Sequence, residues 1–164
     1  MNMNMNIFAL NLESFSHSHY YFLDTKPNII MDGIFTKIFF THECFTLNGI
    51  YFFLPLFCQS FEITPQKQEY LYFEPTNPKN INIIQHCKNI ENTILQAYTN
   101  YKGSNSKKTA IHSIIKQMNC GKCKVQLKNN DKIEKTLNSF VLKISGVWET
   151  QTEYGVTFKI IEQH

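Results

Sequence analysis

A chain of 164 residues, 43% apolar and 14% aromatic, is long enough for one domain of ordinary size and too apolar to stay disordered. All 16 of its basic residues are lysines, so the formal charge of +3 comes without arginine, the side chain that grips guanine or phosphate through paired hydrogen bonds. Five cysteines and the lack of a secretory leader argue against a secreted disulfide framework, and we expect an intracellular protein.

The abundance of other residues suggests a simple origin for the lysine content. Asn occurs 17 times and Ile 19 times, and this abundance of Asn, Ile and Lys is what an AT-rich coding sequence produces. Taken alone, the positive charge is therefore weak evidence for a nucleic-acid partner.

The longest uncharged stretch, Phe45 to Phe61, is short for a helix that crosses a membrane. Asn48, Gly49 and Pro55 interrupt it. We therefore expect buried strands in this region and no membrane association.

Residues 1–25 are expected to form an N-terminal arm and 26–164 a single domain. The arm begins with a Met-Asn repeat. From Ile7 to Leu23 it mixes aromatic and polar residues in a pattern that fits a strand or an extended segment.

Two segments dense in β-branched and aromatic residues follow, Gly33 to Thr41 and Ile50 to Phe57. The Asn48-Gly49 dipeptide between them predicts a tight turn, and hence a meander. Pro55 predicts that the second strand ends, bulges or lies at an edge there, because proline has no N–H to donate. A further short strand is expected from Tyr70 to Phe73.

One substantial helix is predicted after Asn77. Asn at the N-cap, followed by Pro78 at the first helical position, is a typical helix start, and Gly103 supplies the stop. Apolar residues at three- and four-residue spacing lie between them: Ile83, Cys87, Ile90, Ile94 and Tyr98. Gly103 to Lys108 is small and polar and predicts a loop. Ala110 to Met118 fits either a short helix or a strand, and its apolar spacing favours the helix.

Alternation of apolar and polar residues is strongest near the end of the chain. Lys124 to Lys128 predicts a half-buried strand, and Ser139 to Glu162 predicts a β-hairpin. Strict alternation puts Phe140, Leu142, Ile144, Gly146 and Trp148 on one face of the first hairpin strand, and Val141, Lys143, Ser145, Val147 and Glu149 on the other. In the second strand, Tyr154, Val156, Phe158 and Ile160 share a face.

Strands followed by one long helix and further strands do not form the strand-helix alternation of a parallel doubly wound sheet. We therefore expect a mainly β fold. The arrangement that fits best is a partly closed β-barrel with one substantial α-helix between its third and fourth strands.

Five lysines are candidates for a surface that follows a phosphate backbone. Lys122, Lys124 and Lys128 are evenly spaced, so on a strand they project from one face. Lys143 and Lys159 lie on the two hairpin strands and are opposite in parity to the apolar residues, which predicts that both reach solvent. Such lysines form a phosphate track in some proteins and a solvated sheet face in others.

Single-stranded nucleic-acid binders add exposed rings to a basic surface, and each stacked base contributes about 1–3 kcal/mol. Tyr51, Tyr70, Tyr72, Trp148 and Tyr154 are the candidates, because Tyr and Trp tolerate partial exposure better than Phe. The sequence does not separate them from rings of the core.

Cys120 and Cys123 form a CGKC segment with half of a zinc ribbon's spacing, and no second spaced pair accompanies it. A small zinc-binding module organised by these two cysteines is therefore an alternative; otherwise no metal or cofactor is expected. Hydrolase, zinc-protease and phosphate-loop motifs are absent from the sequence, so we do not expect an enzyme.

The segment FVLKISGVWETQTEYGVTFKII, Phe140 to Ile161, resembles the closing strands of OB-fold single-stranded DNA-binding proteins encoded by large DNA viruses. GIFTKIFFTHECFTLNGIYFFLPL, Gly33 to Leu56, is similar to their opening strands. The resemblance implies an OB-like β-barrel that coats unpaired DNA during replication or recombination and needs no cofactor. It also implies that the lysines follow the DNA backbone and that Trp148 or Tyr154 stacks on bases.

The leading hypothesis is a sequence-nonspecific single-stranded DNA-binding protein that acts in viral DNA replication or recombination, in the host nucleus or at a cytoplasmic replication site. Its expected partners are single-stranded DNA, replication proteins and further copies of the chain. The alternatives are the zinc-binding module and a non-enzymatic viral structural or interaction protein with a solvated lysine face.

Overall fold

The computed structural model describes residues 8–103, 107–127 and 139–163. The described elements are two 3₁₀ turns (Leu12–Ser14 and His17–His19), β1 (Tyr20–Pro27), β2 (Ile34–His42), β3 (Phe45–Asn48), β4 (Ile50–Leu54), β5 (Cys58–Ile63), β6 (Glu69–Phe73), α1 (Pro78–Lys102), β7 (Thr109–Ile111), α2 (Ser113–Cys120), β8 (Lys122–Gln126), β9 (Ser139–Glu149) and β10 (Glu153–Gln163). The fold is mainly β, as the sequence predicts.

All the described strands belong to one mixed sheet. Its main path runs β1, β2, β9, β10, β8, β6, β5, with β3 paired to β2, β4 to β9, and β7 to β10. Most pairs are antiparallel, but β10 runs parallel to β7 and to β8. The path ends at β1 and β5, and no pairing among the described residues joins these two strands, so the sheet is open.

The long helix lies where the sequence predicts it. The side chain of Asn77 accepts a hydrogen bond from the backbone N–H of Lys79 at 3.0 Å, and Pro78 is the first helical residue. The helix ends at Gly103, whose φ of 62° is the left-handed conformation that glycine adopts without strain. α1 follows β6, so it does not connect the third and fourth strands.

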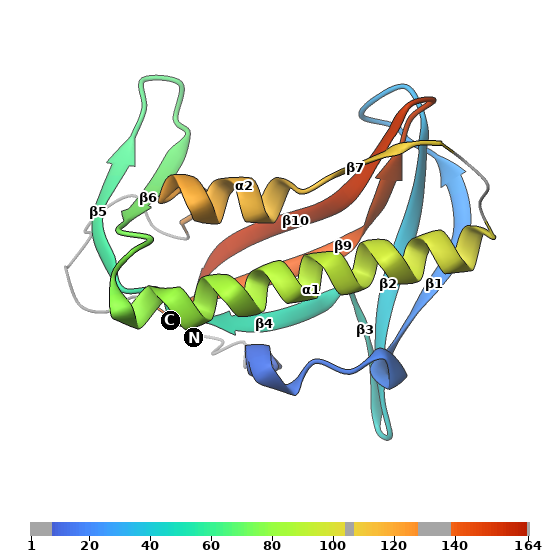
Figure 1. The fold of residues 1–164 in the computed structure, drawn as a ribbon, viewed down its shortest axis with the longest axis horizontal. Coiled ribbons are helices and arrows are strands. Elements are labelled where there is room, and N and C mark those ends of the chain that lie inside the picture. Colours follow the sequence, from blue (N-terminus) through green and yellow to red (C-terminus); the bar gives the residue numbers. More distant parts are fainter. Residues whose placement is uncertain (1–7, 104–106, 128–138, 164) are drawn as a thin grey trace, which may run out of the picture.

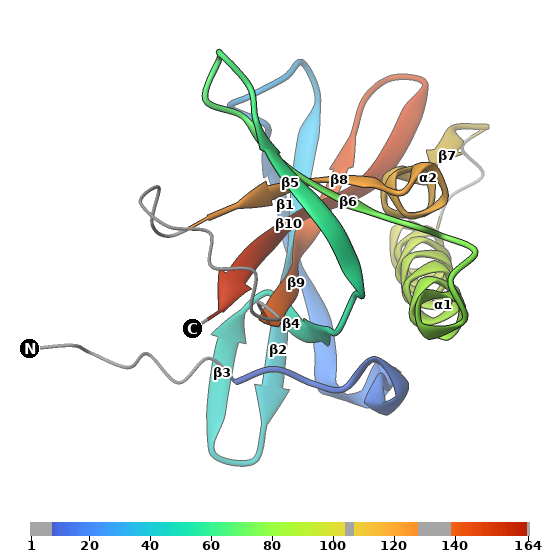
Figure 2. The same ribbon diagram turned by 90° about the vertical axis from the view of Figure 1, so that its left-hand side faces the viewer.

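Both helices lie on one side of the sheet (Figure 2). α1 runs the length of the molecule, from beneath the β5–β6 end to the β1–β2 end, with α2 beside its first half (Figure 1). The core lies between these helices and the sheet and includes Ile38, Phe52, Leu71, Ile90, Ile94, Met118, Leu142 and Ile144. We call the sheet surface turned away from the helices the outer face. In the described part of the chain, no helix is both long and apolar enough to cross a membrane.

A β-bulge interrupts β9. Gly146 pairs with Thr157, and the next pair along the hairpin is Ile144 with Phe158, so Ser145 is an extra residue in β9. Because the side chains of a strand alternate with a period of two, one inserted residue exchanges the faces of everything beyond it.

The bulge corrects the predicted faces of the first hairpin strand. Val147 is fully buried. Glu149 accepts a hydrogen bond from Tyr98 of α1, so its side chain lies on the helix side of the sheet. Both residues were predicted to share a face with Lys143. Trp148 instead lies on the outer face together with Lys143. The predicted alternation is wrong at these positions, because it assumes a strand without an insertion.

The pairing of β3 and β4 also differs from the predicted meander. β3 pairs with β2, but β4 leaves this hairpin and pairs with β9, with Ile50 opposite Ile144. Gly49 allows the change of direction: its φ is 101°, and a Cβ there would lie 2.7 Å from the carbonyl oxygen of Ile144. β4 ends at Leu54, directly before Pro55, as the sequence predicts.

The other predicted elements shift or divide. β6 and β8 lie where strands were expected, although β8 begins at Lys122, and β5 was not predicted. The helix predicted from Ala110 to Met118 divides into β7 and α2. The start of α2 is fixed by a tertiary contact, because the buried Glu91 carboxylate of α1 accepts hydrogen bonds from the backbone N–H groups of Ile114 and Ile115 at 3.0 and 2.9 Å.

Part of the expected N-terminal arm belongs to the sheet. The backbone N–H of Leu10 donates to the carbonyl of Tyr51 at 2.8 Å, and Phe53 donates to the carbonyl of Leu10 at 2.9 Å. β1 spans the boundary expected between residues 25 and 26. The segment before residue 26 therefore extends the sheet beside β2 and β4.

Candidate nucleic-acid interface

Three lysines from three neighbouring strands lie side by side on the outer face. Lys143 of β9 is directly opposite Lys159 of β10. Val125 of β8 is opposite Ile160 of β10 and both are buried, so Lys124 and Lys159, one residue earlier on each strand, lie together on the opposite side. Lys124 and Lys159 are exposed and Lys143 is half-buried. We call Lys124, Lys143 and Lys159 the lysine row.

Tyrosine rings flank the lysine row at both ends. Tyr51 of β4 is opposite Lys143, whose Nζ lies 5.1 Å from the centroid of the tyrosine ring. Tyr70 of β6 is opposite Lys124. A line of side chains therefore crosses β4, β9, β10, β8 and β6 in the order Tyr, Lys, Lys, Lys, Tyr.

Lys122 lies beside this line, on the same face of β8 as Lys124. Its Nζ is 4.2 Å from the ring centroid of Tyr70 and 5.1 Å from that of Tyr72. A hydrogen bond to Tyr72, helped by the charge of nearby Glu62, raises the pKa of Lys122. Because Glu62 also accepts a hydrogen bond from the Tyr72 hydroxyl, part of the Lys122 charge is balanced within the protein.

The two hairpin aromatics predicted to stack lie on opposite faces of the sheet. Trp148 is half-buried on the outer face, where its indole covers Gly155: a Cβ at that glycine would be 2.8 Å from Cζ2 of Trp148. Tyr154 faces the helices instead. Its hydroxyl is 3.2 Å from Oγ1 of Thr99, and its ring is 5.9 Å from that of Tyr98. A ligand on the outer face can contact Trp148 but not Tyr154.

The structure thus brings together most of the residues that the sequence suggested. Those gathered on the outer face are Tyr51, Lys122, Lys124, Lys143 and Lys159, with Trp148 further along it. Tyr154 is separated from them by the sheet. Lys128 lies outside the described residues.

A cavity of about 420 Å³ adjoins the lysine row. Lys124 and Lys159 line it together with Lys67 and Gln68 from the β5–β6 turn and Gln117 from α2. The sequence did not indicate the last three residues as site residues. They come from separate elements, and only the packing of α2 and the parallel register of β8 with β10 brings them together.

A second cavity, of about 690 Å³, lies beside the β1–β2 turn. Phe35, Lys37 and Phe39 of β2 line it, and so do Ile29 and Ile30. These two isoleucines are 98% and 89% exposed, which is unusual for large apolar side chains. The turn therefore carries the two most exposed large apolar side chains among the described residues.

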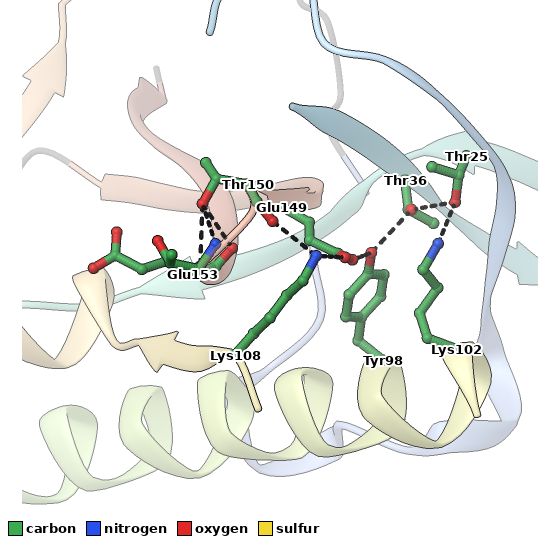
Figure 3. Close-up of polar contacts among 9 residues, drawn as sticks. Thr25, Thr36, Tyr98, Lys102, Lys108, Glu149, Thr150 and Glu153 are labelled. Carbon is green, nitrogen blue, oxygen red and sulfur yellow. Dashed lines mark hydrogen bonds and ion pairs between the residues drawn. The ribbon is translucent and has the colours of Figure 1, made fainter. Parts of the chain in front are cut away.

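A partly buried polar network lies on the helix side of the sheet (Figure 3). The Glu149 carboxylate accepts hydrogen bonds from the hydroxyl of Tyr98 and from Nζ of Lys108. Burial acts to raise the pKa of Glu149, but these two hydrogen bonds outweigh it and the pKa is lowered. The further members of the network are Thr25, Thr36, Lys102 and Thr150.

This network joins the end of α1 to β1, β2 and the turn between β9 and β10 (Figure 3). None of its acidic or aromatic members lines either cavity described above. Burial and the bond to Glu149 raise the pKa of Tyr98. The network therefore has a structural role: it holds the end of α1 against the sheet.

The two cysteines of the CGKC segment do not converge. Cys120 is exposed at the end of α2, whereas Cys123 is buried in β8, where burial raises the pKa of its thiol to about 12. Within residues 8–103, 107–127 and 139–163, no group of three or more His, Cys, Asp or Glu side chains is placed to hold a metal ion. The zinc alternative therefore finds no ligand set in this part of the chain.

Chemically, the outer face combines ammonium groups with partly exposed aromatic rings. Ammonium groups hold phosphates as point charges, and rings provide flat surfaces for bases.

No protein-family model matches the chain, and neither the curated proteins nor the solved structures include a match.

Proposed function

We propose that the protein binds single-stranded DNA without sequence specificity on the outer face of its sheet. One observation carries the proposal: lysines from three neighbouring strands form the lysine row, and tyrosines flank it at both ends. Neither Lys143 nor Lys159 forms a salt bridge with another described residue. No acidic side chain in the described part of the chain therefore balances either charge by a salt bridge.

The chemistry of this face favours a sequence-tolerant ligand. Lysine ammonium groups attract phosphates but do not distinguish bases as paired arginine contacts do. Rings such as Tyr51 and Trp148 stack on any base, and they reach the bases only in an unpaired strand. The face therefore suits single strands better than a duplex.

The proposal includes a non-catalytic role in viral DNA replication or recombination, alongside replication proteins and further copies of the chain. It also includes an OB-like architecture. Supporting this are the strongly twisted sheet, in which β5 and β6 cross in front of β9 and β10, and the long helix inserted between strands (Figure 2). The resemblance of Phe140 to Ile161 to closing strands of that family points the same way.

A fluorescence-anisotropy titration tests the proposal. Labelled oligo-dT and a duplex of equal length are titrated at about 50 and 200 mM salt. We expect tighter binding of the single strand. If the three lysines of the lysine row each contact one phosphate, affinity should fall about 20-fold between the two salt concentrations, because single-strand affinity varies with a slope near −0.7 per phosphate. Undetectable or salt-insensitive binding contradicts the proposal.

A second candidate function has an observation of its own. The exposure of Ile29 and Ile30 beside an apolar cavity is typical of a surface that meets another protein, so the chain is also a candidate interaction protein with a solvated lysine face. Under this alternative, replacing both isoleucines with Ser removes a partner, and replacing the lysine row leaves binding unchanged. The anisotropy titration then shows no oligonucleotide binding.

A further inference from the structure

The cavity beside the lysine row occupies a gap in the sheet. β10 pairs with β7 through residues 153–155 and with β8 through residues 160–161, and no register pair to either strand covers residues 156–159. Phe158 and Lys159 line the cavity along this stretch of β10, which has no strand paired to it on the side of β7 and β8. Gln117 of α2 lines it as well, so the helix layer closes what the sheet leaves open.

Gln117 presents a hydrogen-bond donor to the cavity. Its Oε1 accepts the backbone N–H of Lys124 at 3.2 Å, and a backbone N–H can only donate, so the orientation of the amide is determined. The NH₂ group of Gln117 has no hydrogen-bond partner among the described residues. Gln68 is similar, because its Oε1 accepts the hydroxyl of Tyr70 at 2.7 Å.

Three lysines, Lys67, Lys124 and Lys159, are among the residues that line the same cavity. Glu69 is the carboxylate among the lining residues, and its Oε2 is occupied by the backbone N–H of Leu127 at 2.7 Å. Among the described lining residues, three positive charges against one negative charge give an excess of cationic donors. Its side chains therefore suit an anion with several oxygens.

Lys67 adopts a backbone conformation that a lysine rarely takes. Its φ is 58°, in the left-handed region where glycine and asparagine are common at turns. Lysine is less favourable there, and its side chain lines the cavity. Lys67 is therefore an unusual residue for this turn, and it lines the cavity.

We propose that the cavity binds a terminal phosphate of the DNA strand, an inference that rests on the proposed function. An internal phosphodiester has one negative charge and two free oxygens. A terminal phosphate carries about −1.5 to −2 charges at neutral pH and has three free acceptor oxygens, which better match three ammonium groups and two amide NH₂ groups. The phosphates of the strand follow the lysine row, and its phosphorylated end enters the cavity between β8 and β10.

The test compares oligo-dT carrying a 5′-phosphate, a 3′-phosphate or no terminal phosphate, each labelled at the other end or internally and titrated against the 164-residue chain. We expect one phosphorylated form to bind at least about 5-fold more tightly than the unphosphorylated strand, since charge-assisted hydrogen bonds are the strong ones. The form that gains identifies which end is bound. Equal affinity of all three strands overturns the cavity inference alone, whereas failure of every strand to bind overturns the proposed function and this inference with it.

Two variants localise the effect. Lys67→Asn removes the ammonium group and suits the left-handed backbone, so it should fold at least as well as the native chain. Gln117→Glu keeps the acceptor for the Lys124 N–H and replaces the NH₂ donor by a negative oxygen. Both should abolish the preference for the phosphorylated strand. Lys67→Asn should leave the affinity for the unphosphorylated strand within about twofold, because Lys67 is not part of the lysine row.

Lys116→Gln is the matched control, because Lys116 is exposed on α2 and does not line the cavity. It removes one positive charge, as Lys67→Asn does, and should keep the preference. A preference that survives both cavity variants, or one that Lys116→Gln abolishes equally, overturns the inference. Urea unfolding of each variant establishes that it is folded.

Discussion

Lys143 and Lys159 lie directly opposite each other in the β9–β10 hairpin, on the face of the sheet that the helices do not cover. Like charges placed opposite each other across an antiparallel pair are destabilising. Neither lysine forms a salt bridge with another described residue, so the repulsion between them is not relieved within the part of the chain that the structure describes. An anionic ligand would relieve it.

Lys159→Gln should therefore change stability and binding in opposite directions. Removing the repulsion with Lys143 should raise the free energy of unfolding by about 0.2–1 kcal/mol. Removing a phosphate contact should weaken oligo-dT binding by up to about 5-fold, the equivalent of about 1 kcal/mol. Urea unfolding and anisotropy measure the two effects. A fall in stability would contradict the repulsion between Lys143 and Lys159, and unchanged affinity would contradict a phosphate contact at Lys159.

Trp148 is the only tryptophan of the chain, so its fluorescence reports on the outer face directly. Stacking of a base on the indole should quench this fluorescence on addition of oligo-dT, and Trp148→Leu should lose about 1–3 kcal/mol of binding free energy. Tyr154→Phe is the control on the opposite face. It removes the hydrogen bond to Thr99, which should lower stability by about 0.5–1.5 kcal/mol without changing affinity. Unchanged tryptophan fluorescence at saturation would exclude base stacking at Trp148.

Glu149 should make stability depend on pH in the acid range. Its pKa in the folded state is lowered, so its contribution to stability is present above the unfolded-state pKa of about 4.3 and is lost as the pH falls through the lower folded-state pKa. Glu149→Gln should lower the free energy of unfolding by about 1–3 kcal/mol at neutral pH, because Lys108 loses its charged partner. The difference in free energy of unfolding between Glu149→Gln and the native chain should become smaller as the pH falls. The neighbouring exposed Glu153, changed to Gln, should shift stability by less than about 0.5 kcal/mol.

Glu91 should show the opposite pH dependence. Burial raises its pKa more than the N–H groups of Ile114 and Ile115 lower it, so its contribution is complete below the unfolded-state pKa and declines as the pH rises through the raised folded-state pKa. Glu91→Ala leaves both N–H groups at the start of α2 without their acceptor and should cost about 1–3 kcal/mol, most at low pH. Urea unfolding at several pH values measures this. Exposed Asn92, changed to Ala, is the control and should show no pH-dependent difference.

The elements with local signals could be predicted from the sequence. The Asn77-Pro78 start and the Gly103 stop of α1 depend on neighbouring residues only, and so does the end of β4 at Pro55. The parity of Lys143 and Lys159 relative to the apolar residues around them likewise placed both on the outer face. These patterns identified most of the lysine row.

The rest depends on tertiary contacts that a sequence pattern does not contain. The bulge at Ser145 exchanged the faces of Val147 and Trp148; the neighbouring Gly146 is the one local sign of it, and a glycine within a strand does not fix where the extra residue lies. The parallel approach of β8 to β10 is set by the packing of α2, which in turn begins where Glu91 of α1 caps it. The cavity residues Lys67 and Gln117 could not be predicted for this reason.

The salt dependence of oligo-dT binding tests the lysine row most directly. The native chain is compared with a triple variant of Lys124, Lys143 and Lys159 changed to Gln, and with a control in which Lys88, Lys107 and Lys116 are changed to Gln. We expect the plot of the logarithm of the association constant against the logarithm of salt concentration to become shallower by about 2 in the first variant and to keep its slope in the control, because each lost phosphate contact removes about 0.7. Equal slopes in all three proteins would contradict binding of the phosphate backbone by the lysine row.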